Sequence, residues 1–138
     1  MTATTVDIRP AGRAGLWTGR AMSGLVGLFL VMDAGMKFAD LPQVEQATAQ
    51  LGFAHSSVLP IAVLEVACLA LYLVPRTAAL GAVLLTGLLG GTVAAHMRVG
   101  DPMFSHVLFG VYLGVLAWGG LWLRDAKVRA LLPLRSQP

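Results

Sequence analysis

Long apolar segments dominate the pattern of this chain. Between residues 21 and 123, four segments are each long enough to cross a bilayer, because a hydrocarbon core of about 30 Å takes about 20 helical residues. The last two, Thr77–Ala95 and Met103–Leu123, contain no Asp, Glu, Lys or Arg. The pattern therefore predicts an integral membrane protein made of α-helices.

The first two apolar segments differ from the last two because they contain charges. Asp33 and Lys37 interrupt the first segment, and Glu65 lies near the centre of the second. A charge in hydrocarbon is costly, about 2.5–3.5 kcal/mol by insertion measurements, so these side chains are expected to face the interior of a bundle. The contrast indicates where a polar interior lies.

The expected elements follow from the apolar runs and the breakers between them. We predict an all-α, four-helix up-down bundle over residues 16–123, because two of the three connections are short and adjacent helices must then be antiparallel. The flanking segments 1–15 and 124–138 are expected to be a disordered tail and a basic tail, both cytoplasmic. The predicted helices cover about residues 16–38, 57–74, 77–97 and 103–123.

Composition and charge exclude several classes of protein. The chain is 57% hydrophobic and 12% charged, which leaves too few polar residues to cover a water-exposed surface. The net charge is +3, but the basic residues are dispersed along the flanks of the apolar segments, so no nucleic-acid site is expected. The single cysteine, Cys68, excludes an intramolecular disulfide and a cysteine-based metal cage.

The basic residues also predict an orientation. Eight of them fall on the side that would collect both tails and the second loop, and only Lys37 and Arg98 fall on the other side. Because cytoplasmic loops carry the excess of Lys and Arg, both termini are expected to be cytoplasmic. The eight are Arg9, Arg13, Arg20, Arg76, Arg124, Lys127, Arg129 and Arg135.

Glycines at a spacing of four residues occur in the last two segments. Gly87 and Gly91 form one such pair, and Gly110 and Gly114 form the other. Small residues let membrane helices approach closely, so these glycines are predicted to serve helix packing. Packing inside one bundle is the first interpretation, and a homodimer face is the alternative.

Six ionisable residues are expected to converge in the half of the bilayer away from the cytoplasm. Helices that alternate in direction bring their outer ends together, and a rise of about 1.5 Å per residue gives the depth of each side chain. Oppositely charged groups that meet in such a place could form a network close to neutrality, the form in which buried charge is tolerable. This polar cluster consists of Asp33, Lys37, Glu65, His96, Arg98 and His106.

Several roles for this polar cluster stay open. The network could only fix the register of the helices, without chemistry. It could line a pocket for a small polar or quinone-like molecule, with Glu65 and His96 exchanging protons. It could relay protons or a solute, although the inner half lacks matching groups. A metal site is disfavoured, because the histidines and Glu65 show no HxxxH or ExxH spacing.

One long motif resembles a known family. The run Leu71–His106, LYLVPRTAALGAVLLTGLLGGTVAAHMRVGDPMFSH, is similar to the central signature of the DoxX-like family of small bacterial membrane proteins. The similarity extends from Trp17 to Pro133 and includes the closing stretch Trp118–Arg135. It implies a four-span bundle in the bacterial cytoplasmic (inner) membrane. Positions that match the polar pattern of the family are Lys37, Glu65, Arg76, His96, Arg98 and Asp101.

The resemblance implies less about activity. The family takes its name from a subunit associated with quinone-linked sulfur oxidation, and it provides no established catalytic residues to transfer. We therefore expect an accessory or small-molecule-binding subunit without catalysis of its own. It is expected to lie in a lipid bilayer and to associate with either a membrane protein partner or a second copy of itself. The alternatives are a quinone-interacting subunit of a membrane oxidoreductase and a small-solute transporter. No cofactor is expected, with a quinone as the one alternative.

Overall fold

The computed structural model describes residues 11–132, all of whose regular elements are helices. Four helical stretches are long and apolar enough to cross a membrane: Arg13–Phe38, His55–Leu73, Ala78–Val99 and Met103–Arg124. The prediction of an all-α protein with four such stretches is confirmed. The elements are α1 (Arg13–Phe38), α2 (Pro42–Gln50), the 3₁₀ turn η1 (His55–Ser57), α3 (Val58–Leu73), α4 (Ala78–Val99), the π-helical turn η2 (Met103–Val107), α5 (Phe109–Arg124) and α6 (Ala126–Leu131).

The bounds differ from the sequence prediction in three places. Helix α1 begins at Arg13, so residues 13–15 are helical and do not belong to a tail; the expected disorder of residues 1–10 lies outside the described residues. The segment expected as a basic tail contains α6. The last long stretch is not one α-helix, because it opens with the π turn η2 before α5 begins.

Local sequence explains where the elements begin and end. Pro42 occupies the first turn of α2, where a missing backbone N–H does no harm. Helix α3 stops at Val74, next to Pro75, which cannot continue it. Helix α4 ends at Gly100, whose φ of 75° is the left-handed conformation that glycine adopts without strain. Asp125 caps α6 by accepting a hydrogen bond from the backbone N–H of Lys127 at 2.8 Å.

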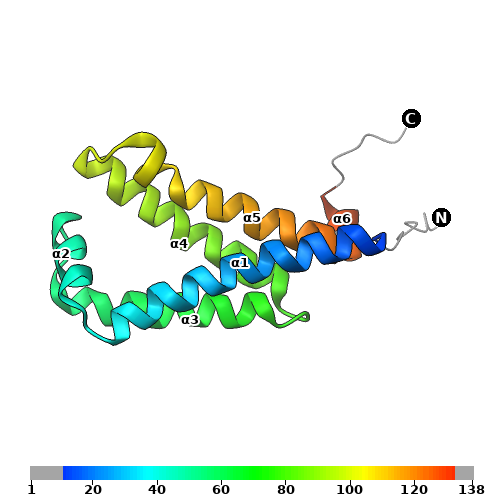
Figure 1. The fold of residues 1–138 in the computed structure, drawn as a ribbon, viewed down its shortest axis with the longest axis horizontal. Helices are drawn as coiled ribbons and strands as arrows, with labels where there is room; N and C mark the ends of the chain where they lie inside the picture. Colours follow the sequence, from blue (N-terminus) through cyan, green and yellow to red (C-terminus); the bar gives the residue numbers. More distant parts are fainter. Residues whose placement is uncertain (1–10, 133–138) are drawn as a thin grey trace, which may run out of the picture.

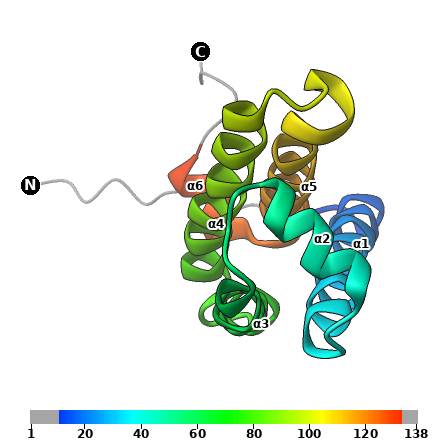
Figure 2. The same cartoon turned by 90° about the vertical axis from the view of Figure 1, so that its left-hand side faces the viewer.

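The four long helices pack around a common core. Helix α1 lies against α3 and α5, and α4 lies against the same two helices from the other side, as Figures 1 and 2 show. Contacting residues run in opposite chain directions along α1 and α5, from Gly19 against Leu123 to Phe29 against Phe109. The start of α1, the α3–α4 turn and α6 lie at one end of the bundle, and α2 lies across the other end (Figure 1).

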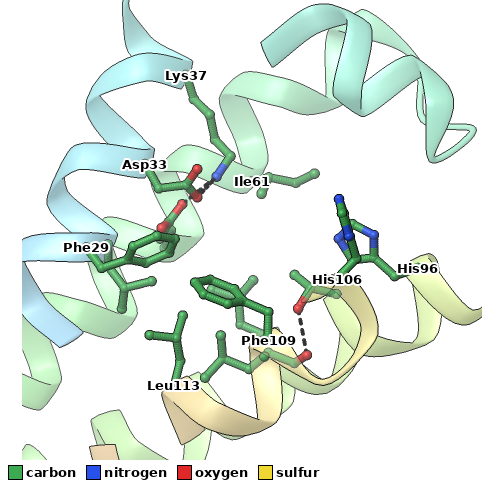
Figure 3. Close-up of a pocket in the computed structure, with 14 residues that line it drawn as sticks. Phe29, Asp33, Lys37, Ile61, His96, His106, Phe109 and Leu113 are labelled. Atoms are coloured by element: carbon green, nitrogen blue, oxygen red, sulfur yellow. Dashed lines mark hydrogen bonds and ion pairs between the residues drawn. The ribbon is translucent and has the colours of Figure 1, made fainter. Parts of the chain in front are cut away.

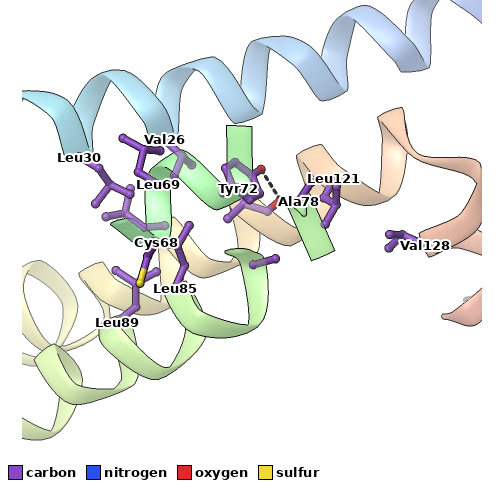
Figure 4. Close-up of a cluster of buried hydrophobic side chains, with 13 residues drawn as sticks. Val26, Leu30, Cys68, Leu69, Tyr72, Ala78, Leu85, Leu89, Leu121 and Val128 are labelled. Atoms are coloured by element: carbon purple, nitrogen blue, oxygen red, sulfur yellow. Dashed lines mark hydrogen bonds between the residues drawn. The ribbon is translucent and has the colours of Figure 1, made fainter. Parts of the chain in front are cut away.

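A buried tyrosine organises the core near the α6 end (Figure 4). The hydroxyl of Tyr72 donates to the carbonyl of Ala117 at 2.7 Å and lies 2.8 Å from the hydroxyl of Ser23. Since the tyrosine has only one proton, Ser23 is the donor in the second bond. Tyr72 is fully buried, so this pair of bonds ties α1, α3 and α5 together with its polar atoms satisfied. Arg124 adds a bond from Nη2 to the Tyr72 carbonyl at 3.1 Å.

The outer surface of the bundle is apolar. Large side chains such as Leu28, Leu64, Val83 and Val115 each expose more than half of their surface. In water such a surface would drive aggregation, whereas lipid chains cover it without loss. The four long helices therefore form a membrane-embedded bundle with lipid as its environment.

The four packing glycines do not share one role inside the bundle. A Cβ atom on Gly110 would lie 2.9 Å from the carbonyl oxygen of Leu89, so this glycine allows α4 and α5 to touch. A Cβ atom on Gly114 would lie 4.0 Å from Cδ1 of Leu89, which is an ordinary van der Waals contact. A Cβ on Gly87 or Gly91 would meet no atom within 4 Å, because both face away from the other helices. The interpretation of Gly87 and Gly91 as packing residues within one bundle is therefore wrong, whereas the homodimer alternative stays a prediction.

Candidate functional site

A lysine and two carboxylates form the most polar point of the bundle interior. Asp33 and Lys37 lie one turn apart on α1, and Glu65 faces them from α3. The ammonium of Lys37 pairs with Asp33 and donates to Oε2 of Glu65 at 2.9 Å. The geometry follows from the sequence, because a spacing of four residues places acid and base on one helix face. The two helices are thus joined by an ion pair at their α2 end.

Glu65 is the most deeply buried of the three groups. Its residue is only 2% exposed, and its second carboxylate oxygen, Oε1, has no hydrogen-bond partner. A buried carboxylate oxygen without a donor is costly in a folded protein, so each such atom needs an explanation. Among the described residues, Glu65 Oε1 and Arg124 Nε are the buried side-chain polar atoms in this condition.

A pocket of about 200 Å³ opens beside this ion pair. Figure 3 shows Asp33 and Lys37 on one side of it, His96 and His106 on the opposite side, and the rings of Phe29 and Phe109 nearer the bundle core. Helices α1, α3, α4 and α5 all contribute to its wall. The lining residues are Phe29, Leu30, Asp33, Lys37, Ile61, Glu65, Leu88, Leu89, Thr92, His96, His106, Phe109, Gly110 and Leu113.

The two histidines approach each other, and their hydrogen-bond partners in the described part of the chain are Asp101 and Ser105, not Glu65. Their rings meet edge to face at 5.8 Å between centroids. Nδ1 of His96 lies 2.6 Å from Oδ2 of Asp101, and because a carboxylate only accepts, this nitrogen carries the proton. Nδ1 of His106 lies 2.8 Å from the hydroxyl of Ser105. The π turn η2 carries His106, so it sets where this ring meets α4.

Arg98 does not join the others in the pocket wall. Its guanidinium donates to the backbone carbonyl of Leu51, where α2 ends, and its side chain is absent from the pocket lining. Arg98 is the last charged residue of α4, so its long side chain reaches outward to the α2 end instead of inward. The expectation of a single network that includes Arg98 is therefore corrected: the structure brings together Asp33, Lys37 and Glu65, and separately His96 with His106.

Sequence reasoning missed the apolar half of this site. Phe29 and Phe109 pack edge to face at 5.0 Å between ring centroids, and Ile61 and Thr92 complete the wall. Nothing distinguishes these residues from ordinary span residues in the sequence. Thr92 is the exception, because the sequence places it one helical turn before His96, on the same face of the helix. Its hydroxyl donates to the carbonyl of Leu89 at 2.7 Å, which leaves the oxygen as an acceptor.

A closely packed layer separates the pocket from the Tyr72 end. Val26, Leu69 and Leu85 lie in this layer and are nearly or fully buried. Cys68 is also buried there, as part of the core. In the described part of the chain, no group of three or more His, Cys, Asp and Glu side chains is arranged to hold a metal ion. The site is therefore a polar pocket with an apolar floor.

Comparison with known proteins agrees with the fold. Residues 21–120 match the DoxX-like family, and these residues include all of the pocket lining. Neither the curated proteins nor the solved structures contain a match to the chain. The family match covers more than half of the 138 residues. This protein, with four helices long and apolar enough to span a bilayer, is therefore a multi-pass membrane protein that belongs to the DoxX-like family.

Proposed function

We propose that this protein is a small-molecule-binding or accessory subunit of the bacterial cytoplasmic membrane, with its binding site in the outer half of the bilayer. The observation that carries the proposal is the carboxylate of Glu65, which is 2% exposed, lines a pocket of about 200 Å³ and has one oxygen without a partner. Holding charged groups in a membrane interior is costly, and such residues mark functional sites by default. A bundle that needed only stability would be served by apolar side chains at these positions.

The charge distribution supports an orientation for this site. Of the described basic residues, only Lys37 and Arg98 lie toward the α2 end of the bundle. The others lie toward the α6 end, which makes that end the cytoplasmic one by the positive-inside rule. The helices would then cross the membrane in up-down order with both termini inside, and the pocket would face the outer half. The residues at the cytoplasmic end are Arg13, Arg20, Arg76, Arg124, Lys127 and Arg129.

The pocket volume limits the size of the ligand. Drug-sized ligands occupy pockets of about 300–1,000 Å³, whereas an apolar cavity of about 150 Å³ is enough to bind benzene. A volume of about 200 Å³ therefore suits a molecule with a single ring or a short branched chain. The faces of Phe29 and Phe109 supply apolar contact for such a body.

The quinone and transporter alternatives receive less support. A quinone offers two carbonyl acceptors, but this pocket has the acceptors Glu65 Oε1 and Thr92 Oγ1 and only one N–H left on Lys37, so its hydrogen-bonding groups suit at most one carbonyl of an oxidised quinone. A transporter needs a path to the other side, whereas the buried core residues Val26, Leu69 and Leu85 lie between the pocket and the Tyr72 end of the bundle (Figure 4).

A pocket-filling variant tests the proposed function. Ile61→Phe adds volume to the pocket wall, and Leu64→Phe adds the same ring to the lipid-facing side of the same helix, where Leu64 is 57% exposed. A panel of single-ring molecules, neutral and charged, would be screened in detergent by thermal shift. We expect at least one molecule to raise the Tm of the wild type and of Leu64→Phe but not of Ile61→Phe. If every molecule that stabilises the wild type stabilises both variants equally, the pocket is not a binding site.

A further inference from the structure

We propose that the pocket binds a small organic monocation that carries N–H donors, such as a primary ammonium or amidinium on a single ring. This inference rests on the proposed binding function and adds the chemical class of the ligand. It starts from the ion pair. With both carboxylates ionised, Asp33, Lys37 and Glu65 together carry one negative charge, because one ammonium faces two carboxylates. A net charge in a low-dielectric interior is expensive, and one cation in the pocket cancels it.

The direction of the hydrogen bonds leads to the same class of ligand. Oε1 of Glu65 is buried, unpartnered and on a residue of the pocket wall. The hydroxyl of Thr92 already donates a hydrogen bond to the carbonyl of Leu89, so its oxygen can only accept a further hydrogen bond. In His96, Nδ1 donates to Asp101, which leaves the other ring nitrogen as an acceptor when the ring is neutral. These three acceptors on residues of the pocket wall outnumber the one N–H that Lys37 has left after its two bonds to carboxylates, and they call for a ligand rich in donors.

The aromatic wall favours a cation over a neutral donor. Phe29 and Phe109 pack edge to face at 5.0 Å between ring centroids, and both line the same pocket as the carboxylates of Asp33 and Glu65 (Figure 3). A cation near the face of a phenyl ring is attracted by the ring quadrupole, most strongly where water is excluded. A molecule of benzylammonium size would place its ammonium toward Glu65 and its ring among these side chains, within about 200 Å³.

The test compares isosteric probes on the full-length protein in detergent. Benzylammonium and the neutral benzyl alcohol would be titrated by calorimetry against the wild type, Glu65→Gln and Asp33→Asn. Glu45→Gln, an exposed carboxylate on α2 outside the pocket, is the matched control. We expect benzylammonium to bind at least tenfold more tightly than benzyl alcohol. We also expect Glu65→Gln and Asp33→Asn to lower benzylammonium affinity at least tenfold, with Glu45→Gln unchanged.

The outcomes separate this inference from the proposed function. If benzyl alcohol binds as tightly as benzylammonium, or if benzylammonium does not bind at all, the cation assignment is wrong. The pocket can still be a binding site in that case, because the comparison of Ile61→Phe with Leu64→Phe decides that question with other molecules. Should Glu65→Gln fail to fold, Asp33→Asn removes the same negative charge from a side chain that is 32% exposed, and unchanged benzylammonium affinity in that variant would overturn the inference.

Discussion

Lys37 on α1 and Glu65 on α3 lie 2.9 Å apart, from the ammonium nitrogen to a carboxylate oxygen, although 28 positions separate them in the chain. The ammonium also pairs with Asp33 one turn earlier on its own helix. One cation thus serves two carboxylates within a bundle whose outer surface is apolar. The ion pair is the point at which helix packing and the proposed site depend on the same side chains.

Removing the lysine should destabilise the bundle. In Lys37→Met the two carboxylates face each other without a cation, and breaking a buried pair costs about 3 kcal/mol or more. Arg98→Met is the control, because the bond of Arg98 in the described residues is to the Leu51 carbonyl at an exposed position. Unfolding by SDS titration should show a loss of about 3 kcal/mol for Lys37→Met and less than about 1 kcal/mol for Arg98→Met. Equal losses would mean that Lys37 has no special role.

The hydroxyl of Tyr72 should contribute measurably to stability. Tyr72→Phe removes the bonds to Ser23 and to the Ala117 carbonyl and leaves both partners buried. We expect a loss of about 1–3 kcal/mol, the cost of leaving buried polar groups unsatisfied. Tyr112→Phe, at a side chain that is 45% exposed, should change stability by less than about 0.5 kcal/mol. Similar SDS unfolding curves for the two variants would contradict the role of Tyr72.

Alanine substitutions should distinguish glycines at a helix contact from glycines that face open space by their effect on stability. In Gly110→Ala the added methyl group meets the Leu89 carbonyl at 2.9 Å, so α4 and α5 must move apart, at a cost of about 1–3 kcal/mol. In Gly87→Ala the methyl group meets open space, and the higher helix propensity of alanine should make the change neutral or stabilising by up to about 1 kcal/mol. Thermal unfolding in detergent measures both. A large loss for Gly87→Ala would indicate an interface that involves the outer face of α4.

The proposed orientation can be measured by labelling. Single cysteines at Glu45 in α2 and at Arg76 in the α3–α4 turn, in a Cys68→Ala background, report on opposite ends of the bundle. In intact bacterial cells we expect a membrane-impermeant maleimide to label Glu45→Cys, and to label Arg76→Cys only after lysis. The reverse pattern would place the pocket on the cytoplasmic side.

Much of the fold follows from the sequence because its physical signals are local. Apolar runs of membrane length and the breakers Pro75 and Gly100 define the long helices to within a few residues. The π turn η2 carries no such signal. Helix α6 was missed because the positive charge near it favours reading the segment as a tail, although Asp125 is an ordinary capping residue.

Charge made the contact between Lys37 and Glu65 predictable, but not the position of Arg98 or of the aromatic wall. An acid and a base four residues apart in a membrane helix, with a second acid on the next helix, are too costly to leave unpaired, so the contact of Lys37 with Glu65 could be expected. The direction in which Arg98 points depends on where α2 ends, which no local pattern determines. Phe29 and Phe109 resemble lipid-facing residues in sequence, and only the three-dimensional arrangement brings them to the pocket.

A double-mutant cycle on Lys37 and Glu65 tests the central claim most directly. Lys37→Met, Glu65→Gln and the double variant would be compared with the wild type by SDS unfolding. Residues in direct contact show coupling energies of about 0.5–3 kcal/mol. If the two side chains meet as described, the double variant should be more stable than the sum of the single losses predicts, by at least about 1 kcal/mol. Strictly additive losses would contradict the ion pair and, with it, the site built around it.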